Sequence, residues 1–214
     1  MDEEITIIDA NTRNEKIRNF LINNKKNFII MISIIFLLLI GYFSFDVIKK
    51  KNKIELTNKF SSATTNLRTG QDKKSIEQLI NIISKQDATY SPLALYFLID
   101  NNLIESKIEI NDLFDILINK TNFEKEIKNL IIYKKALFNS NFANENELIQ
   151  ILNPIINSES IWKSHSLYLM GEYFYSKKEK QKAKEFFNQI LSLPIGNNDI
   201  KLKSQKRINR DFSE

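Results

Sequence analysis

The hydrophobic residues of this chain follow two different patterns. From Phe28 to Phe45 the chain reads FIIMISIIFLLLIGYFSF, eighteen residues without a charged side chain. After residue 54 the apolar residues instead recur at spacings of three, four and seven, the period of a helix with one apolar face. The first pattern predicts one long apolar helix, and the second predicts a series of shorter amphipathic helices.

The amphipathic part divides into stripes of roughly eight to fifteen residues, each long enough for one helix. Short polar connectors separate them, and such connectors suit helices that pack antiparallel to their neighbours. Ser91 and Pro92 are typical of the first turn of a helix. Pro154 allows two interpretations, since it could open a new helix or kink one that begins near Glu145. The clearest stripes cover residues 76–83, 93–99, 113–118 and 127–138.

The apolar segment is long enough to cross a membrane. At 1.5 Å per residue it covers about 27 Å of a hydrocarbon core that is about 30 Å thick. Lysines flank both ends, and Tyr42 and Phe43 lie near the second boundary, where aromatic rings favour the interface. We predict a transmembrane helix over residues 28–48. A cleaved signal peptide would have a shorter leader and a small-residue cleavage site, and a buried core helix rarely lacks charge over such a length.

Charge does not fix the orientation of this predicted span. Five basic residues precede it and five follow it closely, so the positive-inside rule favours neither side. The arm before the span, residues 1–27, also carries five acidic residues, which leaves it neutral overall.

The composition excludes several kinds of protein. Without Cys, the chain has no disulfide scaffold, thiol nucleophile or lipid-linked Cys anchor. A single His excludes a site built from several histidines, and no phosphate-binding loop or hydrolase motif occurs. Four Gly and three Pro are too few for a sandwich or barrel, and a net charge of +5 is mild for 214 residues. We expect an all-α protein without enzymatic activity, cofactor, metal, nucleic-acid partner or small-molecule substrate.

The segment from Ser164 to Pro194 follows the pattern of a tetratricopeptide repeat, a pair of antiparallel helices. Its small residues, Gly171 and Ala183, stand twelve positions apart, where two helices must approach closely. Aromatic residues three and sixteen positions after Gly171 would fill the space beside this crossing. A generic amphipathic hairpin is the alternative. The residues of the pattern are Met170, Gly171, Phe174, Ala183, Phe187 and Pro194.

Weaker copies of the pattern lie upstream. Ala94 and Phe97 repeat its first offset, and Ala63 begins a similar copy. A copy near Tyr133 is degenerate, because a large residue takes the place of the small one. We therefore predict a short solenoid of four tetratricopeptide-like hairpins over residues 54–195. The remaining segment, residues 196–214, is expected to be a capping helix or a frayed end.

One face of the last repeat is a candidate binding surface. In such repeats the first helix lines a concave groove, and its positions there hold two tyrosines, a carboxylate and an imidazole. These side chains suit an extended peptide or a loop of a partner protein. The alternative is that they pack against the C-terminal segment and bind nothing. The four residues are His165, Tyr168, Glu172 and Tyr175.

The order of these parts resembles the YfgM-like family, the ancillary subunits of the bacterial SecYEG translocon, in its alphaproteobacterial form. The resemblance covers nearly the whole chain and rests on the arm IIDANTRNEKIRNFLINNKKNFIIMISIIF followed by degenerate helical repeats. The chain departs from the family in having Asn and Lys before the span, where aromatic residues are usual, and in having few Ala-rich helices. The resemblance implies an inner-membrane protein with a cytoplasmic N-terminus and a periplasmic repeat domain, with SecYEG and periplasmic chaperones as partners.

Two functions compete on this basis. The first is a membrane-anchored adaptor at the Sec translocon, which links protein export to periplasmic chaperones. The second is an assembly factor for another inner-membrane machine, such as cytochrome c maturation or envelope biogenesis, because anchored repeat proteins serve those machines too. Both functions share every sequence feature described above.

Overall fold

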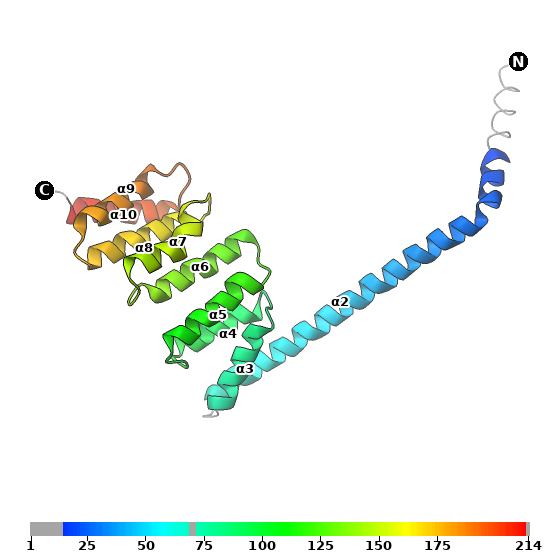
Figure 1. The fold of residues 1–214 in the computed structure, drawn as a ribbon, viewed down its shortest axis with the longest axis horizontal. Helices are drawn as coiled ribbons and strands as arrows, with labels where there is room; N and C mark the ends of the chain where they lie inside the picture. The colour runs from blue at the N-terminus through cyan, green and yellow to red at the C-terminus, as the bar shows by residue number, and fades with distance from the viewer. Residues whose placement is uncertain (1–14, 69–71, 213–214) are drawn as a thin grey trace, which may run out of the picture. The chain divides into compact units, whose positions relative to one another are not determined.

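The computed structural model of the chain describes residues 15–68 and 72–212. Within those residues every regular element is a helix and no strand occurs, which confirms the all-α prediction (Figure 1). The chain divides into two compact units, Met1–Glu55 and Leu56–Glu214. The acidic start of the predicted arm falls in residues 1–14, outside the described residues.

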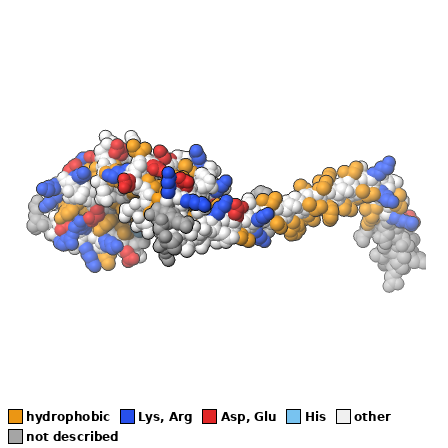
Figure 2. All heavy atoms as spheres, turned by 90° about the horizontal axis from the view of Figure 1, so that it is seen from below, with side chains coloured by type: hydrophobic (Ala, Val, Ile, Leu, Met, Phe, Trp, Pro, Cys, Tyr) orange, Lys and Arg blue, Asp and Glu red, His pale blue; other side chains and the backbone are white. Residues whose placement is uncertain are grey.

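The first unit contains a helical segment over residues 15–23 and the first part of α2, a helix that runs from Lys25 to Arg68. The large apolar side chains from Ile29 to Ile40 are 47 to 68% exposed. Consecutive helical residues point in different directions, so no side of the helix is covered there. Among the described residues, α2 is the helix long and apolar enough to cross a membrane, and none of its most apolar stretch is buried (Figure 2). A core helix would be mostly buried, so α2 does not match that interpretation.

The second unit begins with the last turns of α2 and continues, in its described part, as a series of helices of 11 to 15 residues. Each helix from α3 onward contacts the next one along the chain, as in a helical repeat. The helices are α3 (Asp72–Ser84), α4 (Tyr90–Asp100), α5 (Lys107–Lys120), α6 (Lys125–Asn139), α7 (Glu145–Ile156), α8 (Lys163–Ser176), α9 (Lys180–Ser192) and α10 (Asn198–Asp211).

One stripe of each helix is buried, which is why the apolar period predicted the helices. In α7 the stripe contains Leu148, Leu152 and Ile155, all fully buried. Such four-and-three spacing places side chains on one face of a helix. The stripes join into two neighbouring clusters, one centred on α3 to α5 and the other on α7 to α9. The hydrophobic core is therefore a row of helix interfaces and not one central mass.

Polar side chains set the ends of several helices. Ser106 accepts a hydrogen bond from the Glu109 amide at the start of α5, and Asn144 forms a capping box with Glu147 at the start of α7. Pro92 lies in the first turn of α4, as the sequence predicts. Pro154 lies inside α7, so it does not open a new helix.

The C-terminal segment is a helix, α10, rather than a frayed end. Ile200 and Ser204 are buried on its inner face. Lys203, Gln205 and Lys206 are exposed on its other side. Leu202 is also exposed, at 55%, so the outer side of α10 is largely but not wholly polar.

Candidate functional site

The four residues predicted to form a binding face lie on α8 and are half-buried. Their spacings of three, four and three place them on one side of the helix. The structure nevertheless divides this side into two parts with different surroundings. Glu172 and Tyr175 are in contact with α10, whereas His165 borders an open pocket.

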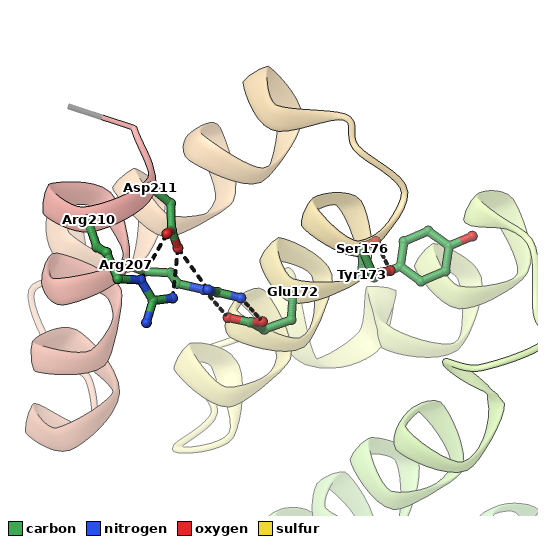
Figure 3. A network of polar contacts seen from close by, with 6 residues as sticks. All are labelled: Glu172, Tyr173, Ser176, Arg207, Arg210 and Asp211. Carbon is green, nitrogen blue, oxygen red and sulfur yellow. Dashed lines mark hydrogen bonds and ion pairs between the residues drawn. The ribbon is translucent and has the colours of Figure 1, made fainter. Parts of the chain in front are cut away.

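An ion-pair cluster fastens α10 to α8 (Figure 3). The guanidinium of Arg207 donates two hydrogen bonds to Glu172, from Nε to Oε1 at 2.8 Å and from Nη2 to Oε2 at 2.5 Å. It also donates from Nη1 to Asp211 at 2.7 Å. This fork geometry is the strongest arrangement that a carboxylate and a guanidinium form. The hydrogen bonds to Glu172 raise the pKa of Arg207, and those from Arg210 hold the pKa of Asp211 below its usual value.

Aromatic contacts extend this closed part. The guanidinium carbon of Arg207 lies 4.2 Å from the centre of the Tyr175 ring, and Phe212 packs against Tyr175 at 5.8 Å. Tyr168 contacts Phe187 of α9 at 5.5 Å between ring centres. Burial, and then the nearby Glu172 carboxylate, raise the pKa of Tyr168. Of the two interpretations of this face, packing against the C-terminal segment is the one observed for Glu172 and Tyr175.

His165 belongs to a different group of side chains. Its ring lies 5.2 Å from that of Trp162 and 6.0 Å from that of Tyr133, which comes from α6. Burial, and then the positive charge of Lys203, lower the pKa of His165, which favours the neutral imidazole. A neutral imidazole next to two aromatic rings forms a largely apolar wall.

This wall borders a pocket of about 680 Å³, within the size range of ligand-binding pockets. The pocket lies between the connection from α7 to α8 and the connection from α9 to α10. Ile161 and Ile195 line it with side chains that are 65% and 89% exposed. Sequence patterns do not group these two residues, because they belong to two connections more than thirty positions apart. The remaining lining residues are Ser158, Glu159, Ser160, Trp162, Lys163, His165, Leu193, Pro194, Gly196 and Asn197.

Apart from Pro194, the residues of the predicted repeat pattern in the last hairpin lie in α8 and α9, which pack against each other. A Cβ atom added to Gly171 would lie 2.6 Å from Cε1 of Phe187, which is closer than real Cβ contacts come. Ala183 is fully buried, as is Met170, and Phe174 stacks on Phe186 with ring centres 5.4 Å apart. Upstream, Ala94 is fully buried and Phe97 packs against Phe60. Pro194 lies in the connection that follows α9 and is exposed.

The degenerate copy in α6 differs in detail from the expected one. Tyr133, at the place expected for a small residue, stacks on Trp162 with ring centres 5.8 Å apart. The fully buried small residue of α6 is Ala136, three positions later. Its partners in the second core cluster include Leu148 and Leu152 of α7. A local shift of this kind cannot be read from one sequence.

A second pocket, of about 560 Å³, lies between α5, α6 and α7. Asn111 and Asn139 exchange two hydrogen bonds beside it, at 2.8 and 3.0 Å. Lys135, which also lines it, is paired with Asp115. These polar groups therefore satisfy one another within the chain.

Within residues 15–68 and 72–212 no group of three or more His, Asp or Glu side chains is placed to hold a metal ion. No protein-family model, curated protein or solved structure matches this chain.

Proposed function

We propose that this chain is a single-pass membrane protein whose helical-repeat domain binds other proteins. The observation that carries the proposal is the contrast between the two units. One contains an apolar helix with nothing covering it, and the other contains stacked amphipathic helices with an open pocket. Lipid would cover the first, and helical repeats of this kind commonly serve as binding surfaces.

The proposed repeats are tetratricopeptide-like hairpins. The close approach of Gly171 and Phe187 at the crossing of α8 and α9 supports this assignment, as does the burial of Ala63, Ala94 and Ala183. In that scheme the hairpins are the end of α2 with α3, α4 with α5, α6 with α7, and α8 with α9. The helix α10 closes the last hairpin.

Within this scheme we assign the chain a YfgM-like role. It would be an adaptor at the Sec translocon of the bacterial inner membrane, with a cytoplasmic N-terminus and a periplasmic repeat domain. It would link SecYEG to periplasmic chaperones without performing a reaction itself. The support is the resemblance in the order of parts, together with the apolar stretch of α2, none of which is buried.

Topology is the first test of this proposal. Alkaline phosphatase fused after Glu214 should be active in cells, because that enzyme folds only in the periplasm, and green fluorescent protein at the same place should be dark. The reverse result would overturn the orientation and the YfgM-like assignment together. Fusions to a chain with Leu38→Arg, which breaks the apolar run, provide the matched control.

Co-purification is the second test. The tagged full-length chain, extracted in mild detergent, should retain SecYEG subunits and periplasmic chaperones. Recovery of haem-lyase or envelope-assembly components instead would favour the second function, an assembly factor for another inner-membrane machine. Recovery of a soluble enzyme complex from the cytoplasm would contradict both.

A further inference from the structure

The helical segment of residues 15–23 ends at a turn just before the apolar run of α2. Asn24 forms the turn, and α2 begins at Lys25. The side-chain Nδ2 of Asn24 and its backbone N–H both donate to the carbonyl oxygen of Phe20, each at 3.0 Å. A side chain that competes for a backbone carbonyl can bend a helix. The chain changes direction at this turn, which lies just before the start of the apolar run at Phe28 (Figure 1).

The segment has one apolar side. Ile17, Phe20 and Leu21 stand at spacings of three and four, which places their side chains together on a helix. These side chains are 51, 60 and 47% exposed, so the described part of the chain leaves this side largely uncovered.

The other sides of the segment are mostly polar. On a helix of 3.6 residues per turn, Lys16 and Arg18 lie on the two flanks of the apolar side, and Asn19 lies opposite it. All three are exposed. Ile22 is the one large apolar residue of this segment that lies away from the apolar side. A helix with Phe and Leu on one side and basic residues around it is typical of helices that lie in the membrane interface.

The apolar side of the segment continues into the apolar run of α2. The rings of Phe20 and Phe28 meet edge to face across the turn, with their centres 5.9 Å apart. Phe28 begins the run of α2 whose most apolar stretch is not buried. The surroundings of α2 at this end therefore reach the apolar side of the segment too. In the proposed function those surroundings are lipid.

Basic residues stand at the height of the lipid phosphates on this side of the predicted span. Lysine and arginine at the end of a membrane helix extend their charged groups to the interface. The acidic residues of the arm other than Glu15 lie at positions 2–9, outside the described residues. Among residues 15–28 the basic residues are Lys16, Arg18, Lys25 and Lys26, and the one acidic residue is Glu15.

From these observations we infer that residues 15–23 lie along the surface of the membrane that α2 crosses. Ile17, Phe20 and Leu21 enter the boundary between headgroups and lipid chains to a depth of about 5–10 Å, and Lys16 and Arg18 contact lipid phosphates. The partner of this face is the phospholipid leaflet on the N-terminal side of the span. This inference rests on the proposed membrane anchoring and adds a lipid contact that does not cross the bilayer.

The chain has no Cys, so one introduced Cys is the only site for a thiol-reactive fluorophore. The full-length chain is labelled at Ile17→Cys, Phe20→Cys or Asn19→Cys. It is then placed in nanodiscs of phosphatidylcholine and phosphatidylglycerol that hold one chain each, so that neither a partner protein nor a second copy covers the label. We expect the labels at Ile17 and Phe20 to emit at shorter wavelength and to be quenched by lipids with a nitroxide near the headgroup. The label at Asn19 should emit as in water.

Two further labels distinguish failure of this inference from failure of the proposed function. A label at Leu38→Cys should be quenched most by a nitroxide at the end of the lipid chain, and one at Lys206→Cys by neither lipid. Water-like emission from the Leu38 label would contradict the membrane anchoring itself. With the Leu38 label quenched, equal signals from Ile17, Phe20 and Asn19 would overturn only the inference. Equal strong quenching would mean a longer span, and equal water-like emission would mean an arm in solution.

A pair of variants tests the apolar side directly. Phe20→Asp, read from the label at Ile17, should lose the shift and the quenching, because a carboxylate on the apolar side opposes its burial in lipid. Asn19→Asp is the matched control, since it adds the same charge on the opposite side, and it should leave the Ile17 signal at the wild-type value. Repulsion from phosphatidylglycerol would act on both variants alike. Loss of the signal in both variants, or in neither, would overturn the inference.

Discussion

The apolar stretch of α2 and the last hairpin use the same residue types in opposite ways. Leu38 in α2 is 68% exposed, whereas Phe187 in α9 is fully buried. In α2 the large apolar side chains follow one another without a polar face, and in α9 they alternate with lysines and glutamates. A helix that is apolar on every side cannot bury all of its side chains within a small chain, so lipid or another protein must surround it. A helix with one apolar stripe can bury that stripe against the next helix.

We expect that single substitutions can weaken either region without affecting the other. Phe187→Ala should have the largest effect. Removing this fully buried ring leaves a cavity at the crossing of α8 and α9 and should lower the free energy of unfolding by about 3–5 kcal/mol. Urea denaturation of the chain in micelles, followed by circular dichroism, measures this loss. Membrane association should not change. The control is Phe43→Ala, because Phe43 is 64% exposed and should leave the unfolding midpoint unchanged.

Leu38→Arg should have the next largest effect, and on the other region. An arginine at the centre of a membrane helix disfavours insertion by about 2.5–3.5 kcal/mol. The variant should shift from the carbonate-resistant membrane fraction toward the soluble fraction, while Leu38→Ile should remain with the membrane. Full retention of the arginine variant would mean that the apolar stretch is covered by protein and not by lipid, which would remove the contrast between the two regions.

Gly171→Ala changes the same helix crossing and should lower the free energy of unfolding by less than Phe187→Ala. The added methyl group would lie 2.6 Å from the Phe187 ring, so the ring or the helix must move. Overpacking of this kind lowers the free energy of unfolding by about 1–3 kcal/mol. Combining it with Phe187→Leu should cost less than the sum of the two single changes, because the smaller side chain makes room. Strictly additive effects would show that the two residues do not share the crossing.

Arg207→Ala should have the smallest effect of this series. It removes the bidentate pair with Glu172 and leaves a carboxylate that is only partly exposed to solvent. Because the pair is half-buried, we expect a loss of about 1 kcal/mol, and Arg207→Lys should recover only part of it, since lysine lacks the planar fork. Hydrogen exchange should show faster opening of α10 with little change in α6. Unchanged exchange in α10 would mean that Phe212 and Ile200 hold this helix alone.

The sequence predicts well what depends on neighbours along one helix. The period of apolar residues predicts the helices, and the spacing of Gly171 and Ala183 predicts where α8 and α9 approach. The sequence predicts poorly the contacts that a helix makes with a segment far away along the chain. The spacing puts Glu172 on one side of α8 with Tyr168 and Tyr175, but its partner Arg207 lies 35 positions away, in a helix whose charges look like those of an ordinary solvated surface. The pocket beside His165 was missed for the same reason, because two connections create it.

The contacts between successive helices also bear on how this chain folds during synthesis. Every helix from α3 to α9 contacts the next one along the chain, so many contacts join segments that are close in sequence. Chains of low contact order fold quickly, and repeats can fold one after another. With α2 made first, the pairs from α3 onward can stack as the ribosome releases them, each on the pair before it.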